Sequence, residues 1–365
     1  MEIYIVVYSL VFVMMFFDCD RISRRTKKLI LVYISFILVA FNGLRWETGT
    51  DWSQYYNIFQ FSDWNNIFSF TRYSNGDSQV EFGFVFVNTL LKSLGLGSYT
   101  FYLTITNAIR FWIISYLVLK YCKYPIVAFC VYVSLNYFFP TRNPFAIIIC
   151  FSAIPFILER RLVPFALVTF IASTIHLSAV VFFGVYFLYN IRLKTPYLFL
   201  LYFLSVSISM LISKLMGDLI PLFALLGNTA ENMSETYTQI GLDDQWATMR
   251  SIPTHVLALF WVSVFSLGVS RLKGEEKNRY QFFLLCYVLS LCMYNLFSAT
   301  LPHLGRFALF IDYSFLLMPL FIERFRKFRV VIIFFLIAFF YYRLNSMIFV
   351  GKWPEAFIPY KTMFD

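Results

Sequence analysis

The sequence predicts an all-α integral membrane protein with about twelve transmembrane helices and no sizeable soluble domain. Of its 365 residues, 60% are hydrophobic and only 14% are charged, whereas a soluble domain carries about 25% charged residues. Apolar runs of the length needed to cross a bilayer recur along the whole chain. Because the alternating segments of a membrane β-barrel do not occur in the sequence, we expect one helical membrane domain over residues 1–365.

The apolar runs place the candidate spans. The first run lacks a basic leader and a small-residue cleavage site, so it is expected to be a retained helix. Two stretches are ambiguous: 80–96 contains Glu81 and Lys92, and 162–190 is too long for one helix and short for two. The spans are predicted at residues 2–17, 29–43, 99–119, 124–139, 143–158, 162–175, 177–190, 195–215, 253–270, 280–300, 306–322 and 330–349.

Basic residues distinguish two arrangements of these spans, because cytoplasmic loops carry an excess of Lys and Arg. If 80–96 lies in the interface and the second ambiguous stretch is a hairpin, 19 of the 30 basic residues fall in inner loops and nine in outer ones. If 80–96 is a span and the second stretch is one helix, the inner count falls to 16. The first arrangement fits better, and it places Arg142 outside and Lys120 inside. In both arrangements the loops 44–98 and 216–252 face outward.

Composition and motifs argue against several functions. The net charge of +10 is concentrated in short clusters between apolar runs, which orient the chain and do not indicate nucleic-acid binding. The six cysteines form no CxxC pair and are expected to be small core residues, so no disulfide or metal site is predicted. The sequence contains no GxxxxGK[ST] loop. No cofactor is expected.

The densest polar constellation follows the second predicted span. Arg45 stands where that helix leaves the membrane, Gly49 permits a tight turn, and Asp51 follows just beyond the lipid boundary. A carboxylate in this zone can be tuned toward general-base work, and a planar guanidinium can clamp a diphosphate. The alternative is a snorkelling arginine and an ordinary capping aspartate. Glu47 is expected to pair with a neighbouring cation.

Other polar residues are predicted at the same membrane face. Glu81 opens the interfacial stretch and is the second choice for the base, after Asp51 and before Glu47. Four more lie in outer turns or at the hairpin tip: Arg142, His176, His303 and Arg306. Each also has a plainer interpretation, as a headgroup contact or a satisfied buried histidine.

Arg110 differs from these residues because it lies in the middle of the predicted span 99–119. A charge at such depth is costly unless it faces a cavity or a partner. We therefore predict a functional or network role for Arg110.

The spacing of these residues resembles the R-x(3)-G-T-D-x(3)-Y signature of the EpsG family, with Arg45, Gly49-Thr50-Asp51 and Tyr55 in its positions. Glu81-Phe82-Gly83 resembles the E-x-G element that follows this signature in that family. Trp52 departs from the pattern, since a small polar residue often follows the aspartate. Weaker similarities in the family's order occur at 140–143, 175–178, 305–306 and 358–360, so the resemblance spans nearly the whole chain.

The resemblance implies a Wzy-like polymerase of bacterial O-antigen or exopolysaccharide, with an architecture similar to multi-spanning lipid-linked glycosyltransferases. Such enzymes act at the periplasmic face of the inner membrane on oligosaccharide repeat units linked to undecaprenyl diphosphate. Membrane lipid and a chain-length regulator are further expected partners. The expected catalytic residues are Asp51, Glu81 and His176. The residues expected to contact diphosphate or glycan are Arg45, Arg110, Arg142, His303, Arg306 and Tyr55.

Three other functions stay open at this point. A flippase of lipid-linked oligosaccharide is expected to show internal repeats and charges at mid-depth on several helices, whereas here the charges cluster at the outer boundary and no repeat is visible. An O-antigen ligase or another lipid-linked sugar transferase requires a similar site. A membrane acyltransferase is disfavoured, because no histidine is followed four residues later by an aspartate.

Overall fold

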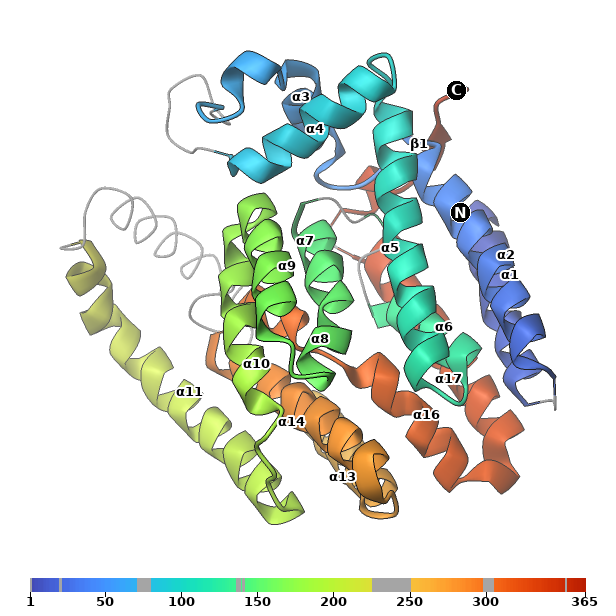
Figure 1. Cartoon of the computed structure of the whole chain (residues 1–365), viewed down its shortest axis with the longest axis vertical. Coiled ribbons are helices and arrows are strands. Elements are labelled where there is room, and N and C mark those ends of the chain that lie inside the picture. Colours follow the sequence, from blue (N-terminus) through green and yellow to red (C-terminus); the bar gives the residue numbers. More distant parts are fainter. Residues whose placement is uncertain are drawn as a thin grey trace. The chain divides into compact units, whose positions relative to one another are not determined.

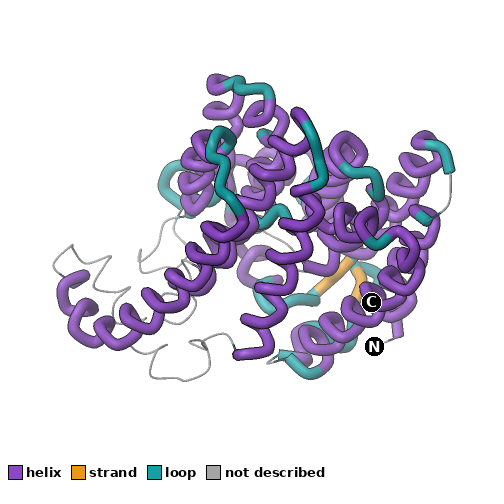
Figure 2. The backbone as a smooth tube through the Cα atoms, turned by 90° about the horizontal axis from the view of Figure 1, so that it is seen from below, coloured by secondary structure: helices purple, strands orange, loops and turns teal. Residues whose placement is uncertain are grey.

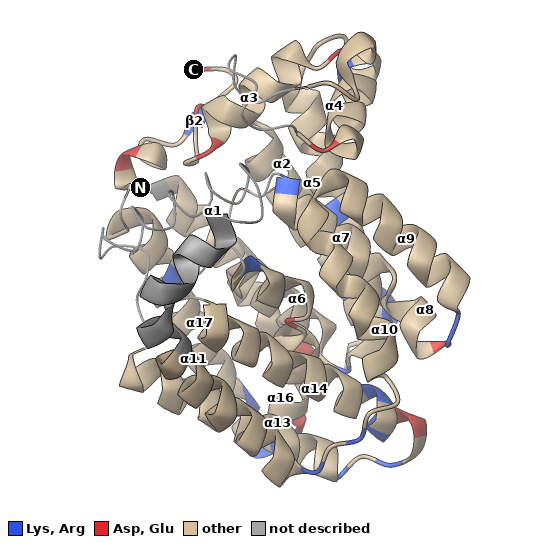
Figure 3. Cartoon of the chain, turned by 90° about the vertical axis from the view of Figure 1, so that its left-hand side faces the viewer, with Lys and Arg blue, Asp and Glu red and all other residues tan. Residues whose placement is uncertain are grey.

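The computed structural model describes residues 2–19, 22–70, 80–135, 139, 142–224, 251–297, 305–351 and 353–365. The chain divides into two compact units, one formed by Met1–Val180 with Ile322–Asp365 and the other by Val181–Phe321. Helices make up nearly all of both units (Figure 1). Charged residues gather near the ends of the helices, and most of the helical length carries none (Figure 3).

The first unit is built around α5 (Tyr99–Tyr121), which packs along α2 (Arg24–Gly43). Serine side chains cap both helices, because Ser23 accepts a hydrogen bond from the Thr26 N–H and Ser98 accepts one from Phe101 N–H. The other elements of this unit are α1 (Glu2–Val13), η1 (Met14–Asp18), β1 (Arg45–Trp46), α3 (Trp52–Phe61), α4 (Phe82–Leu94), α6 (Pro125–Leu135), α7 (Arg142–Ser152), α8 (Ile154–Leu158), α9 (Leu162–Ile175), α17 (Arg329–Leu344) and β2 (Lys361–Thr362).

In the second unit α11 (Thr195–Ala224) packs along α14 (Gly274–Phe297), and α13 (Ile252–Ser270) lies beside α14. Polar side chains join these helices, because Asn295 donates to Ser205 at 3.0 Å and the Tyr202 hydroxyl lies 2.7 Å from His255 Nδ1. The unit also contains α10 (Val185–Leu188), η4 (Arg306–Phe310) and most of α16 (Ser314–Arg324). Most of the predicted outward loop 216–252 lies outside the described residues, and its first part continues α11 beyond the predicted end at 215.

Over the described residues, the predicted spans fall largely on helices or successive helical turns, and the span 306–322 is interrupted at residues 311–313. Five helices are long and apolar enough to cross a membrane, and seven shorter apolar helices accompany them. The chain is therefore a helical multi-pass membrane protein, and the count of twelve spans stays a prediction. At 13 residues, α4 is about 20 Å long, less than the roughly 30 Å of hydrocarbon, as expected for an interfacial 80–96 stretch.

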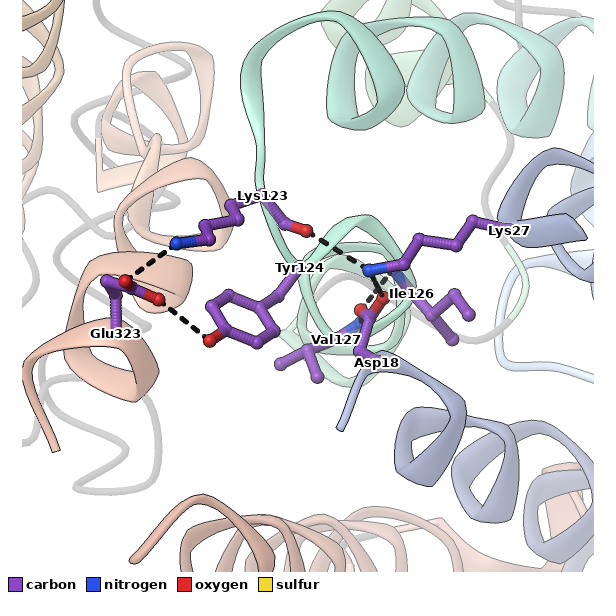
Figure 4. A network of polar contacts seen from close by, with 7 residues as sticks. All are labelled: Asp18, Lys27, Lys123, Tyr124, Ile126, Val127 and Glu323. Carbon is purple, nitrogen blue, oxygen red and sulfur yellow. Dashed lines mark hydrogen bonds and ion pairs between the residues drawn. The ribbon is translucent and has the colours of Figure 1, made fainter. Parts of the chain in front are cut away.

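A polar network at one end of the first unit joins three of the predicted inner loops (Figure 4). Lys27 Nζ lies 2.8 Å from Asp18 Oδ1 and also donates to the Lys123 carbonyl at 3.3 Å. Lys123 in turn pairs with Glu323 at 2.7 Å. The arrangement with 80–96 as a span places 18–28 and 120–123 on opposite membrane faces, so these contacts favour the interfacial arrangement.

The same network fixes the start of α6. The Asp18 carboxylate accepts hydrogen bonds from the N–H groups of Ile126 and Val127, at 2.8 and 2.9 Å. These are N–H groups of the first helical turn, which lack partners within a helix and favour a negative charge. Asp18 thereby ties the end of the first helix to the beginning of α6.

Cysteine labelling tests this arrangement. With Arg142→Cys and Lys120→Cys as single substitutions, a membrane-impermeant maleimide is expected to label the first in intact cells or spheroplasts and the second only after the membrane is permeabilised. The six native cysteines are free and buried, so they contribute little background. The opposite labelling pattern establishes the arrangement in which 80–96 spans the membrane.

Candidate functional site

Arg45 is almost completely enclosed at the end of α2. Its side chain is 1% exposed, Nη1 donates to the Thr48 carbonyl at 2.6 Å, and the guanidinium lies 4.6 Å from the centre of the Phe139 ring. Nε and Nη2 are buried and have no hydrogen-bond partner among the described residues. An unpaired charge in a dry environment is costly, so this guanidinium is suited to receive an anionic ligand group.

The groups around Arg45 do not neutralise it. Burial lowers the pKa of Arg45, and nearby tyrosine hydroxyls oppose that change, but an arginine side chain stays charged in proteins. Burial raises the pKa of Tyr360 while Arg45 acts in the opposite direction, so this hydroxyl stays neutral at ordinary pH. We call this set of residues the Arg45 cage: Arg45, Tyr4, Tyr99, Tyr102, Phe139 and Tyr360.

Gly49 shapes the turn that follows Arg45. Its φ of +109° is strained for any residue with a side chain, and a Cβ atom there would lie 2.9 Å from Arg45 Nη1. Two residues later, Asp51 occupies the first position before α3, yet its side chain makes no capping hydrogen bond and is exposed. The interpretation of Asp51 as an ordinary cap is therefore wrong, and its carboxylate has no hydrogen-bond partner among the residues that the structure describes.

Gly49→Ala is expected to lower activity about tenfold or more, because the new methyl group displaces the guanidinium in addition to a backbone cost of about 1–3 kcal/mol. Gly97→Ala is the matched control: Gly97 also has a positive φ, of +82°, but nothing lies within 4 Å of the position of its Cβ. Thermal unfolding and activity are measured on both purified variants. Equal activity losses in the two variants contradict a specific contact with Arg45.

A second cluster joins three predicted site residues from separate parts of the chain. Glu81 Oε2 lies 2.7 Å from Arg142 Nη1, and Glu81 Oε1 accepts a hydrogen bond from the Leu177 N–H at 3.1 Å. Leu177 follows His176, whose Nδ1 accepts a hydrogen bond from the Ser178 N–H at 3.2 Å. In the neutral ring Nε2 therefore carries the proton. We call Glu81, Arg142 and His176 the Glu81 cluster.

The close approach of two helices produces this cluster. Glu81 stands directly before α4, and His176 directly after α9, and these helices pack together. Gly83 lies against Thr174 with no room for a Cβ atom, so only glycine lets α4 approach α9 so closely. The Glu81-Phe82-Gly83 element thus combines a charged residue with the glycine that positions it.

The Arg45 cage and the Glu81 cluster lie at the same end of the first unit. Phe139, whose ring contacts Arg45, is three residues before Arg142, so their Cα atoms lie at most about 11 Å apart. Tyr55 provides a second link, because its ring packs edge-on against Phe84 of α4 at 5.9 Å. A carboxylate, an imidazole and two guanidinium groups are thus gathered in one region.

The model of the EpsG family matches residues 28–362. The chain belongs to the EpsG family. Comparisons with curated proteins and with solved structures find no match. The family match covers the Glu81 cluster and every member of the Arg45 cage except Tyr4.

The remaining predicted site residues of this EpsG-family protein have different surroundings. Arg110 is 4% exposed, and its Nε donates to the Tyr132 hydroxyl at 2.9 Å within the α5–α6 packing, as in a buried network. Arg306 is exposed in the second unit. His303 lies outside the described residues. The expected convergence of Arg306 with the arginines of the first unit stays a prediction.

The contacts that hold the EpsG-family signature were not predicted from the sequence. Glu47 pairs with a cation as expected, but the partner is Lys361, 2.8 Å away and 314 positions later. Nor were Phe139 and Tyr360 predicted as neighbours of Arg45. The resemblance at 358–360 was the one signal that pointed to this end of the chain, and it carried no information about contacts.

Proposed function

We propose that this protein polymerises undecaprenyl-diphosphate-linked oligosaccharide repeat units into O-antigen or exopolysaccharide, at the periplasmic face of the bacterial inner membrane. The supporting observation is the Glu81 cluster beside the Arg45 cage. It provides a carboxylate, an imidazole and two guanidinium groups whose buried nitrogens include some without a partner among the described residues. Family membership and the multi-pass helical structure agree with the proposal.

In the proposed reaction a hydroxyl at the non-reducing end of one lipid-linked unit attacks the anomeric carbon of the growing glycan. A new C–O bond forms, the bond from that carbon to the diphosphate oxygen breaks, and undecaprenyl diphosphate leaves with the electron pair. The hydroxyl proton passes to a carboxylate acting as general base. Asp51 fits this role best, because both oxygens of Glu81 are already engaged.

The leaving diphosphate requires positive groups with N–H donors. Arg142 uses Nη1 for Glu81, while its buried Nε has no partner among the described residues. Arg45 offers Nε and Nη2 in the same way. Glu81 holds Arg142 in place, so its removal is expected to disturb diphosphate binding.

Deletion of the gene, followed by gel analysis of the surface glycan, tests the proposal. Loss of the ladder with one-repeat material retained is the expected result for a polymerase. Loss of every glycan-capped species instead indicates a flippase or a ligase. Purified protein in liposomes should then convert lipid-linked repeat units to longer products without a nucleotide, and failure of the active preparation to do so contradicts the proposal.

A further inference from the structure

Residues 353–365, here called the closing segment, lie across the turn that carries Arg45. Strand β2 pairs antiparallel with β1, with Thr362 opposite Arg45 and Lys361 opposite Trp46 (Figure 2). Outside this ladder, the Gly49 N–H donates to the Ala356 carbonyl at 2.6 Å. The closing segment therefore holds the backbone of the signature turn on both sides of Glu47.

Side chains of the closing segment complete the surroundings of Arg45. The Tyr360 ring stacks on Phe41, with centroids 4.7 Å apart and planes 9° apart, and its hydroxyl donates to the Phe41 carbonyl. Phe357 stacks on Phe139, the ring that contacts the Arg45 guanidinium, at 6.1 Å. Tyr360 also lies against Phe139, at 6.4 Å between ring centroids, so the closing segment packs two rings against the ring that contacts Arg45.

The one hydrogen bond that the Arg45 side chain makes with the described residues depends on the same segment. Its acceptor is the Thr48 carbonyl, and the Thr48 hydroxyl accepts a hydrogen bond from the Lys361 N–H at 3.2 Å. Because only Nη1 of this guanidinium is hydrogen-bonded to a described residue, its orientation depends mainly on the side chains that pack around it. Loss of these packing contacts lets the guanidinium rotate, and the Nε and Nη2 donors then no longer point in one direction.

We propose that the closing segment is a fixed part of the diphosphate site and that Tyr360 is a positioning residue, which orients Arg45 toward an anionic phosphate group. The proposal rests on the proposed function for the identity of the anion. It excludes a segment that opens during each reaction cycle. It also means that Pro359-Tyr360, which resembles an element of the family, acts through Arg45 rather than through direct contact with the glycan.

A disulfide tests whether the segment stays in place. Leu44 and Met363 continue the β1–β2 register, and the Met363 N–H donates to the Leu44 carbonyl at 2.9 Å. Opposed residues of this kind have Cα atoms about 5.5 Å apart, within the range of a disulfide. Leu44→Cys/Met363→Cys is expected to cross-link on oxidation and to bind inorganic diphosphate as well as the reduced form does. Binding or turnover that is lost on oxidation and restored by reduction overturns the proposal, because the segment then has to move.

A double-mutant cycle tests whether Tyr360 acts through Arg45, with the affinity of the purified full-length protein for inorganic diphosphate as the readout. Tyr360→Ala is expected to weaken binding at least about tenfold, and Tyr360→Phe about threefold to tenfold through the lost hydrogen bond. In an Arg45→Lys background, Tyr360→Ala should cost little more. If the double variant loses affinity by the product of the two single losses, the two residues act independently and the positioning role is overturned.

Two further comparisons separate positioning from folding. Phe364→Ala, at a side chain that is 78% exposed in the same segment, is the matched control and should leave binding unchanged. If Tyr360→Ala does not fold, the cycle is run with Tyr360→Phe. A wild-type protein that binds diphosphate but does not polymerise contradicts the proposed function alone, whereas one that does not bind diphosphate overturns this inference.

Discussion

Asp51→Asn is expected to abolish the glycan ladder, with turnover about 10²–10⁴-fold lower, while the protein is made at normal levels and still binds lipid-linked substrate. The reason is that removal of a general base costs about this much in rate without removing binding groups. The exposed Asp51 carboxylate makes no capping hydrogen bond in the structure. Its loss should therefore affect chemistry more than folding. Glycan gels and initial rates in liposomes measure the effect.

Asp63→Asn is the matched control for this substitution. Asp63 is another exposed aspartate of the same long loop, where it caps the short η2 turn (Trp64–Asn66), and asparagine caps nearly as well. The control should polymerise normally. If Asp51→Asn is active and Glu81→Gln is not, the two carboxylates exchange roles. Normal polymerisation by both variants means that the base lies elsewhere or that leaving-group stabilisation alone is sufficient.

Arg142→Lys is expected to lower the polymerisation rate at least about tenfold. A guanidinium can hold Glu81 with one nitrogen and present another N–H in the same plane, whereas an ammonium group has no such fork. In the structure Arg142 Nη1 pairs with Glu81, and the buried Nε has no partner among the described residues, so it can donate to a ligand oxygen. The initial rate at several donor concentrations should show a raised KM, because diphosphate binding is weakened.

The control for Arg142 is Arg161→Lys. Arg161 is also close to a glutamate, Glu159 at 3.7 Å, but its side chain is 59% exposed and belongs to a predicted inner loop. This variant should be as active as the unchanged protein. Equal rates for Arg142→Lys and the unchanged protein show that charge alone is enough at this position, and the clamp interpretation then fails.

The helices could be predicted from sequence because their signal is local. Continuous apolar runs bounded by basic clusters gave the positions of α2, α5 and α17, and the bias of Lys and Arg favoured the interfacial position of α4. The division of the chain into two compact units is different. It depends on which apolar faces pack together, and runs that are apolar on every side carry no such information.

The proximity of three candidate site residues could be predicted for the same reason. Alternation of the spans places Glu81, Arg142 and His176 at one face, and the structure brings these residues together. The surroundings of Arg45 could not be predicted, because β1 and β2 are two residues each and pair across more than three hundred positions. Strands this short have no periodicity that a sequence can reveal.

The pairing of residues 44–49 with 356–363 also determines when the site can exist during synthesis. Arg45 is translated early. The helices between it and Lys361 are translated before Lys361 is. Until then the signature turn lacks its strand partner, and Phe139 lacks the Phe357 and Tyr360 rings that pack against it. The turn that carries Arg45 thus gains its strand partner only after more than three hundred further residues have been made, so a chain translated short of residues 356–363 carries the signature without the contacts that hold it.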